Sequence, residues 1–307
     1  MLNAIRKLAQ AIIYVARWAP VLFLFALYTW MYYVYTIELC FTAITDLWIR
    51  IIYLFFGNLL LILTLSSHLR AIFCSAGSPT NKFKLTIEQR ETLDKESCED
   101  RRHRLLKSYV QDLPVHTRTF QGEIRYCNVC NNFKPDRCHH CAICKRCVLK
   151  MDHHCPWINN CVGFGTYKYF MLFLFYASIS CVYVSLTDAP YFIKYWQITE
   201  TLHVTHRLQV VFLGLVCFVL LFGLFCLLFY HIFLVSQNRT TLESFRCPVF
   251  ITGPDKNGFN LGFKNNFRQV FGNYPLFWLF PFKTSLGDGL SFPTNIQYEE
   301  TRLLVEK

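Results

Sequence analysis

The sequence predicts a mainly α-helical integral membrane protein, and two observations support that fold class. Of the 307 residues, 53% are hydrophobic, and long stretches carry no charged side chain, which excludes a disordered chain. Fifteen cysteines are present, and eight of them lie between Cys127 and Cys161, a distribution that does not fit a secreted disulfide scaffold. The composition therefore excludes a simple soluble globule.

Four apolar stretches hold much of the hydrophobic content. A helix that crosses a bilayer needs about 20 mostly apolar residues. The alternative is a buried helix in a soluble core, but such a helix normally shows a polar face, and none of the four does. Arg50 lies near one end of its stretch, where a long side chain can reach the headgroups. We predict transmembrane helices at residues 18–37, 47–67, 169–187 and 208–232.

The distribution of positive charge predicts the orientation of these helices. Residues 1–17 carry three cations and no acid, and residues 67–167 carry 16 Lys and Arg against 10 Asp and Glu. Segments rich in Lys and Arg stay in the cytosol. Because the cytosol is reducing, its cysteines favour metal binding or chemistry over disulfides. We expect four cytosolic segments, namely the N-terminus (1–17), a linker (68–125), a cysteine-rich domain (126–168) and a C-terminal region (236–307).

The cysteine-rich segment contains an internal repeat. The spacing C-x2-C-x9-H-x6-C occurs twice, shifted by 14 residues. Three thiolates and one imidazole suit a tetrahedral structural Zn²⁺ and leave no open coordination position. The second set begins before the first ends, so two zinc ions would interlock the segment, and metal binding would supply folding energy. The predicted ligands are Cys127, Cys130, His140 and Cys147 for one zinc, and Cys141, Cys144, His154 and Cys161 for the other.

Other interpretations of these cysteines remain open at this point. They could be redox dithiols or surface cysteines that are themselves acylated, although the paired histidines argue against both. A RING-type ubiquitin ligase also binds two zinc ions through interleaved ligands. However, a RING normally closes with a CxxC pair, whereas the last two cysteines here, Cys155 and Cys161, are separated by five residues.

Removing the eight ligands leaves Cys138, Cys155, His139 and His153. A free thiol has a pKa of about 8.5, so a nucleophilic cysteine needs a base, and a carboxylate can orient that base. Cys155, His153 and Asp152 supply these three roles within four residues. The alternative is that Cys155 is a substitute zinc ligand and that His153 is merely exposed. We interpret Cys138 as a bystander.

The sequence resembles the DHHC protein acyltransferases. Asp152-His153-His154-Cys155, followed by Pro156-Trp157, resembles the motif of their cysteine-rich domain. Thr240-Thr241-Leu242-Glu243 resembles their TTxE motif, and residues 257–272, with Asn266, resemble their C-terminal motif. The resemblance covers nearly the whole chain. It is strongest to the subgroup with broad protein substrates at the Golgi, plasma membrane and endosomes.

The resemblance implies a two-step, ping-pong protein S-palmitoyltransferase. Cys155 would attack the thioester of a long-chain acyl-CoA such as palmitoyl-CoA, and the acyl group would then move to a substrate cysteine. His153 would be the general base, Asp152 its orienter and His154 a zinc ligand. Thr241 would bond near Asp152, and Asn266 would hold the C-terminal helix against the spans. The substrates would be proteins with cytosolic juxtamembrane or membrane-associated cysteines.

Further expectations concern the acyl-CoA. Alignment with the family motifs places Met31 and Ser180 at the far end of an acyl slot, where they would tune chain length; the alternative is that both are ordinary packing or lipid-facing residues. Basic residues on the cytosolic side could bind the phosphates of CoA. The alternative is that these residues only reflect the positive-inside rule. Binding of nucleic acid is disfavoured because the basic residues lie beside membrane spans. The candidate phosphate contacts are Lys134, Arg137, His139, Lys150, Lys168, Arg239 and Arg246.

One position departs from the family pattern. Thr166 stands where the family usually has Asn, which puts any role of that amide in doubt. The sequence is also compatible with a homo-oligomer. The rival functions are a membrane zinc-binding scaffold and a RING-like ubiquitin ligase without acyl transfer.

Overall fold

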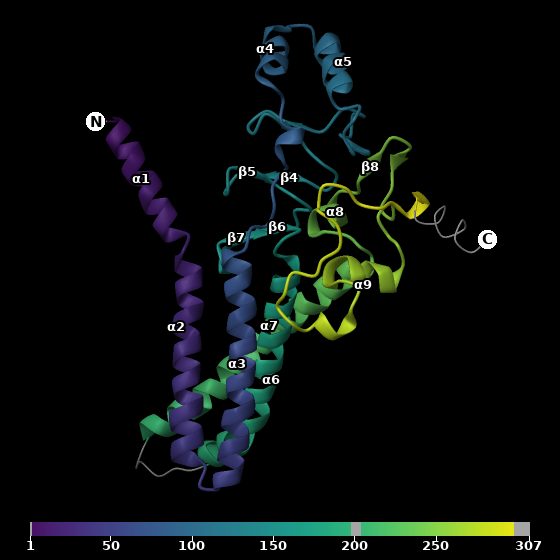
Figure 1. The fold of residues 1–307 in the computed structure, drawn as a ribbon. Coiled ribbons are helices and arrows are strands. Elements are labelled where there is room, and N and C mark those ends of the chain that lie inside the picture. Colours follow the sequence, from purple (N-terminus) through teal and green to yellow (C-terminus); the bar gives the residue numbers. More distant parts are fainter. Residues whose placement is uncertain (1, 198–203, 298–307) are drawn as a thin grey trace, which may run out of the picture. The chain divides into compact units, whose positions relative to one another are not determined.

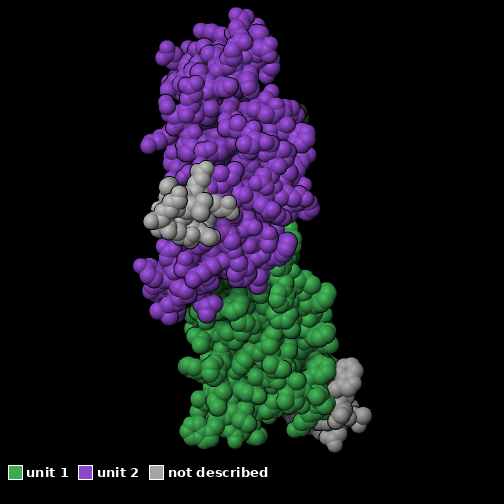
Figure 2. Space-filling model, turned by 90° about the vertical axis from the view of Figure 1, so that its right-hand side faces the viewer, with its two compact units in different colours: residues 1–72, 156–159, 169–230 green, residues 73–155, 160–168, 231–307 purple. Residues whose placement is uncertain are grey.

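The computed structural model describes residues 2–197 and 204–297 (Figure 1). These residues form two units (Figure 2). The first, called here the helix unit, comprises residues 1–72, 156–159 and 169–230. The second, called here the cysteine-rich unit, comprises residues 73–155, 160–168 and 231–307. The last ten residues of the predicted C-terminal region, 298–307, lie outside the described part of the chain.

Helices dominate the helix unit, and all of them except the first, which carries Arg6 and Lys7, are largely apolar. They are α1 (Leu2–Ala16), α2 (Ala19–Tyr33), which continues as a π-helical stretch (Val34–Ala43), α3 (Leu47–Phe73), α6 (Tyr167–Gln197) and α7 (Val204–Ser236) (Figure 1). Among the described residues, four helical stretches are long and apolar enough to cross a membrane: Ala4–Ala43, Leu47–Phe73, Tyr167–Lys194 and Arg207–Ser236. Each predicted span lies in one of these stretches, and the helices extend beyond the predicted ends except at Leu47, where the second helix begins as predicted.

The helix unit packs around a buried apolar cluster. The π-helical stretch contributes Val34 and Leu39, α6 contributes Cys181, and α7 contributes Val210 and Leu213. Partly buried side chains of α2 and α3 pack against this cluster. Because the remaining surface of these helices is also apolar, they have no polar face, which is typical of helices whose outer surface is in lipid.

Three small antiparallel hairpins form the centre of the cysteine-rich unit. They pair β2 (Tyr126–Cys127) with β3 (Asn132–Phe133), β4 (His139–Cys141) with β5 (Arg146–Val148), and β6 (His153–Cys155) with β7 (Asn160–Val162). The hairpins follow one another at intervals of 14 residues. In each turn the same position has a left-handed backbone: Asn131 (φ 51°), Lys145 (φ 52°) and Asn159 (φ 44°). The repeat therefore has three structural copies, although only two carry complete ligand sets.

The segment before the hairpins is helical and partly buried. It contains a single 3₁₀ turn (Asn81–Phe83), α4 (Ile87–Lys95) and α5 (Glu99–Tyr109). Thr86 and Gln89 form a capping box at the start of α4, which satisfies two backbone donors of the first turn. Phe83 packs with Val110 and Phe133 in an apolar cluster beside the first hairpin. The predicted linker 68–125 is thus ordered onto the hairpins over much of its length.

The chain after α7 folds back onto the hairpin region of the same unit. It forms α8 (Thr241–Phe245), β8 (Val249–Phe250), β9 (Gly253–Pro254), α9 (Phe263–Phe271) and a 3₁₀ turn (Pro275–Phe277). Strand β8 lies between β1 (Thr117–Arg118) and β9 in a small antiparallel sheet. Segments far apart in the sequence therefore meet in this unit, and one such meeting point is the motif that begins at Thr240.

Candidate active site and metal clusters

The first group of predicted zinc ligands comes together between two hairpins. The Nδ1 atom of His140 lies 3.5 Å from the Sγ of Cys127, 3.3 Å from that of Cys130 and 4.0 Å from that of Cys147. Cys127 and Cys130 belong to the first hairpin, and His140 and Cys147 face each other across the second. A metal here would fasten the first hairpin to the second.

The second group repeats this arrangement one hairpin later. The Nδ1 atom of His154 lies 3.7 Å from the Sγ of Cys141, 3.4 Å from that of Cys144 and 3.6 Å from that of Cys161. His154 and Cys161 face each other across the third hairpin. Tetrahedral bonds of about 2.3 Å to sulfur and about 2.0 Å to nitrogen place ligand atoms roughly 3.5 Å apart. Both clusters therefore have the donors and the spacing to bind a metal such as Zn²⁺.

The alternation of side chains along β6 explains how neighbouring residues serve different sites. Successive side chains of a strand point to opposite faces. His154 therefore points to the second metal cluster, whereas His153 and Cys155 share the other face. The side chains of His153 and Cys155 are hydrogen-bonded, and Cys155 is 5% exposed. This alternation is a local reason for the Cys155–His153 proximity, and it requires only that the segment be extended.

Asp152 holds the other side of the His153 ring. Its Oδ2 lies 2.6 Å from His153 Nδ1, and the carboxylate is fully buried. Burial alone would lower the pKa of His153, but the bonds to Asp152 and Cys155 outweigh it and raise that pKa to about 9. Because Nδ1 faces Asp152, the other ring nitrogen, Nε2, is the one available to Cys155.

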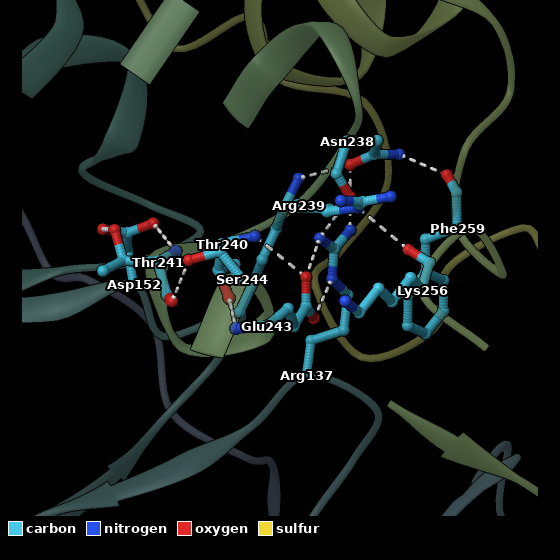
Figure 3. Close-up of polar contacts among 11 residues, drawn as sticks. Arg137, Asp152, Asn238, Arg239, Thr240, Thr241, Glu243, Ser244, Lys256 and Phe259 are labelled. Atoms are coloured by element: carbon cyan, nitrogen blue, oxygen red, sulfur yellow. Dashed lines mark hydrogen bonds and ion pairs between the residues drawn. The ribbon is translucent and has the colours of Figure 1, made fainter. Parts of the chain in front are cut away.

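The motif after α7 contributes two donors to Asp152. The Thr241 backbone N–H donates to Oδ1 and the Thr241 hydroxyl donates to Oδ2, both at 2.8 Å (Figure 3). Thr240 and Glu243 form a capping box that begins α8 and orients Thr241. Glu243 also binds the guanidinium of Arg137, with Nη2–Oε2 at 2.6 Å (Figure 3). Position 241 thus connects the C-terminal region directly to the active-site carboxylate.

Two other motif positions are engaged inside the same unit. Asn266 of α9 donates to the Ser236 carbonyl at the end of α7, at 2.7 Å, and accepts from the Leu261 N–H at 2.9 Å. Thr166 is fully buried. Its hydroxyl donates to the Cys161 carbonyl at 2.8 Å and accepts from the Gly163 N–H at 3.0 Å. The threonine therefore bonds locally beside the last ligand of the second cluster.

The structure separates the candidate phosphate-binding cations into two groups. Arg137 is buried against Glu243 and Asn238, Lys150 donates to Asn238, and Lys168 donates to the Phe277 carbonyl and the Thr284 hydroxyl. These three are therefore occupied by protein partners, and each is buried. The other four candidates, Lys134, His139, Arg239 and Arg246, are partly or fully exposed.

Met31 and Ser180 line one apolar cavity of the helix unit, together with Leu24, Leu61 and Phe173. The hydroxyls of Ser180 and Thr64 lie 3.2 Å apart. Cys138, the remaining cysteine of the hairpin region, is fully buried next to Cys127 and Cys147. It belongs to neither ligand group among the described residues.

Sequence reasoning assigned no active-site role to His231 or Tyr167, which also lie in the region of the candidate active site. His231, near the end of α7, lies with Asp152 and His153 in a group whose donor atoms are within 4.8 Å of one another. The Tyr167 hydroxyl lies 3.1 Å from His231 Nδ1. A histidine at the edge of an otherwise uncharged apolar stretch was the available signal, since such residues are costly in membrane helices and are often functional.

This fold and site define a membrane protein with a Cys–His–Asp group on hairpins that also carry two clusters able to bind a metal. A model of the DHHC palmitoyltransferase family matches residues 121–248. Palmitoyltransferase ZDHHC20-A of Danio rerio is 45% identical over 91% of this chain and 78% of the relative. Palmitoyltransferase ZDHHC2 of Homo sapiens is 43% identical over 95% of this chain and 78% of the relative. The chain belongs to the DHHC palmitoyltransferase family.

Proposed function

We propose that Cys155 carries the acyl group in the reaction of this protein S-palmitoyltransferase. The observation that supports this role is the continuous contact from Asp152 through His153 to Cys155. A carboxylate that orients an imidazole, which in turn activates a nucleophile, is the arrangement that covalent catalysis requires. Membership of the family supplies the reaction, and the contacts in this chain support the roles that we propose for the residues.

In the first step His153 Nε2 takes the proton of the Cys155 thiol. The thiolate attacks the carbonyl carbon of the palmitoyl-CoA thioester and forms a new carbon–sulfur bond. The bond to the CoA sulfur then breaks, and the CoA thiolate takes the proton from His153 as it leaves. Asp152 stabilises the imidazolium that exists between these two proton transfers.

The second step repeats this chemistry with a protein thiol. His153 takes the proton of a substrate cysteine, whose thiolate attacks the acylated Cys155. The Cys155 thiolate leaves and recovers the proton from His153. One base thus serves both half-reactions, which is the basis of a ping-pong mechanism.

We propose that each Cys₃His cluster holds a structural Zn²⁺. The ligand sets are complete, so neither metal would offer an open position for catalysis. Bound zinc would instead hold His154 on its face of β6, and so keep His153 and Cys155 on the opposite face.

The apolar cavity of the helix unit is the proposed site of the acyl chain, with Met31 and Ser180 tuning its length. Burial of a chain is favourable by about 0.8 kcal/mol per CH₂ group. Enlarging both residues, as in Met31→Phe with Ser180→Phe, should shift the preference toward shorter acyl-CoA chains in a competition assay. An unaltered preference would contradict this assignment.

For the CoA phosphates, the partly or fully exposed cations Lys134, Arg239 and Arg246 are the better candidates. Burial lowers the pKa of His139 to about 3, so its imidazole is uncharged at neutral pH and is the weakest candidate. The buried partners of Arg137, Lys150 and Lys168 argue for structural roles at those positions. For cellular placement, we propose cytosolic termini, a cytosolic cysteine-rich domain between the second and third spans, and residence at the Golgi, plasma membrane or endosomes. The proposed substrates are proteins with membrane-proximal cytosolic cysteines.

Incubation of the purified protein with labelled palmitoyl-CoA tests the mechanism. Wild type should acquire a hydroxylamine-sensitive label, because a thioester is formed, and Cys155→Ser should not. Equal labelling of Cys155→Ser would exclude Cys155 as the nucleophile. Absence of label from a protein that binds two zinc ions would indicate a scaffold, and E2-dependent ubiquitin transfer would indicate a ligase.

A further inference from the structure

His68 is a buried polar residue in a membrane-spanning helix, and the proposed mechanism assigns it no task. It lies near the C-terminal end of α3, and its side chain is fully buried. The stretch Leu47–Phe73 that contains it is largely apolar. An ionisable side chain in such a stretch is costly and is often functional. His68 is therefore a candidate for a role beyond packing.

Both ring nitrogens of His68 face oxygen atoms of the helix unit. Nε2 lies 3.0 Å from the Trp157 carbonyl oxygen. A carbonyl oxygen only accepts hydrogen bonds, so Nε2 carries a proton and donates to this oxygen. Nδ1 lies 3.4 Å from the Tyr28 hydroxyl, which can donate to it. Two polar contacts, one to α2 and one to the Trp157 backbone, thus fix the direction in which the ring points.

Aromatic rings fix the plane of the His68 ring. The ring of Phe173 in α6 lies nearly parallel to it, with the centroids 4.4 Å apart and the planes at 15°. The ring of Phe25 is also nearly parallel, at 5.6 Å and 17°, and the ring of Tyr28 meets it edge-on at 5.8 Å. Parallel-offset and edge-on contacts are the arrangements that aromatic rings prefer. Tyr28 and Phe173 also line the apolar cavity, so His68 packs against two residues of the cavity wall.

The carbonyl that His68 binds belongs to the turn after the proposed nucleophile. Cys155 is the last residue of β6, and a 3₁₀ turn (Pro156–Ile158) follows it. Residues 156–159 belong to the helix unit, whereas the turns of the other two hairpins belong to the cysteine-rich unit. The turn that follows Cys155 is therefore anchored among the long helices, and His68 supplies a hydrogen bond to it within that unit.

We propose that His68 is a positioning residue for acyl transfer, because it fixes the turn that follows Cys155 to two residues of the cavity wall. This inference rests on the proposed roles of Cys155 as the nucleophile and of the cavity as the site of the acyl chain. Trp157 is two residues from Cys155, so a freer turn leaves the thiol less well placed for attack. Loss of placement slows the reaction of bound substrate and leaves burial of the acyl chain unchanged. His68 should therefore affect the maximum rate rather than the palmitoyl-CoA concentration that gives half of it.

Labelling of the purified full-length protein by palmitoyl-CoA tests this role. His68→Phe keeps an aromatic ring beside Phe25 and Phe173 and removes the N–H donor. The rate constant of Cys155 labelling at saturating palmitoyl-CoA should fall by about tenfold, in the range for a misplaced reacting group. The half-saturating concentration and the final labelled fraction should match those of wild type. A wild-type rate constant, even with a smaller labelled fraction as poor folding would give, would overturn the proposal, and so would a change in the half-saturating concentration alone.

A second pair of variants tests the hydrogen bond itself and does not depend on the folding of His68→Phe. Gln and Met side chains have similar lengths, but only Gln carries N–H donors. His68→Gln should be labelled faster than His68→Met, because its amide can donate to the Trp157 carbonyl. Equal rate constants for these two variants would exclude a role of the donor. Ser67→Ala is the matched control, since this buried hydroxyl on the same helix bonds the Leu63 carbonyl, and its loss should leave the rate constant unchanged.

Wild type and Cys155→Ser separate this inference from the proposed function. If wild type is not labelled, or if Cys155→Ser is labelled equally, the proposed mechanism fails and the role of His68 fails with it. If wild type is labelled through Cys155 and the His68 variants are all labelled at the wild-type rate, the mechanism stands and the role of His68 alone is wrong.

Discussion

The ionised form of Asp152 depends on the donors around it. Burial alone would raise the pKa of this carboxyl. The bond and charge of His153, the nearby His231 and the Thr241 N–H more than compensate and hold the pKa below its usual range. Asp152 is therefore kept as an anion, which is the form that its proposed role as the orienter of His153 requires.

Thr241→Val should slow acyl transfer by about tenfold, in the range for loss of one positioning contact. The substitution removes the hydroxyl donor to Oδ2 and keeps the backbone N–H. The labelling rate of Cys155 at saturating palmitoyl-CoA measures the effect. Ser244→Ala is the matched control, since that hydroxyl bonds the Thr241 carbonyl rather than Asp152. A wild-type rate in Thr241→Val would mean that the backbone donor suffices.

Lys150 contributes a pH-dependent penalty to stability. Burial, with Arg137 nearby, lowers the pKa of Lys150 to about 7, whereas in the unfolded chain it is about 10.4. The unfolded state therefore binds more protons between these values, so stability rises with pH across this window. The loss of folding stability caused by the buried charge of Lys150 is largest below about pH 7.

Lys150→Met should therefore stabilise the protein most at or below pH 7, by about 1–3 kcal/mol as for other buried charges replaced by apolar groups. Its advantage over wild type should shrink as the pH approaches 10. Thermal unfolding of both proteins in detergent at pH 6.5 and 9.5 measures the difference. Lys134→Met, at a half-exposed position, should show no such trend. A constant advantage at both pH values would contradict the assignment of the penalty to Lys150.

The three hairpins have turns of the same length, and each turn contains a residue with a left-handed backbone. Asn131, Lys145 and Asn159 have left-handed backbones at equivalent turn positions. Asparagine tolerates this conformation better than most residues, whereas lysine has no special preference for it. Lys145 is exposed, so the effect of a substitution at this position should come from the left-handed backbone conformation rather than from side-chain packing.

Lys145→Val should destabilise the second hairpin by about 1–2 kcal/mol, the cost of a left-handed conformation for a side chain with a branched Cβ. Lys145→Gly should be neutral or mildly stabilising, because glycine adopts this region freely. The rate of zinc transfer to a chelator should rise only in the valine variant. Lys84→Val, at an exposed position with φ −86°, is the control. Equal effects of valine at positions 84 and 145 would rule out a backbone cause.

Arg137 shows how the C-terminal region is held to the hairpins. Its guanidinium bonds both Glu243 oxygens, at 2.8 and 2.6 Å, and the Asn238 side chain at 2.9 Å. It also lies over the rings of Phe259 and Phe292. A buried charge that loses its partner costs about 3–5 kcal/mol, so this pair fastens α8, and with it Thr241, beside the active site.

Metal binding should stabilise the cysteine-rich unit, because hairpins of two or three residue pairs are too short to be stable alone. Chelation should therefore open residues 126–162 to proteolysis, while the apolar core of the helix unit, whose described residues contain no metal cluster, stays intact. His154→Ala should show the same cleavage without chelator, and His153→Ala should resist and retain two zinc ions. Loss of zinc from His153→Ala would show that the two histidines have been assigned the wrong way round.

Much of this protein was predictable from local patterns. The four apolar stretches predicted four helices of membrane-spanning character, and the 14-residue spacing predicted two groups of metal donors. Both signals are local, since helix hydropathy and ligand spacing depend on residues close together in the sequence. The third copy of the repeat was missed because its ligand positions hold Ile158 rather than cysteine. The left-handed turns at 14-residue intervals became visible only in the structure.

The sequence by itself therefore determined the helical membrane class, the two Cys₃His groups that could bind a metal, and the Asp152-His153-His154-Cys155 motif. Only the tertiary structure decided which cations are buried, and it placed Thr241 and His231 beside Asp152. The physical reason is that these contacts join segments about 80 to 90 residues apart. Such contacts depend on how α7 and the chain after it pack in three dimensions, and no local spacing encodes that packing.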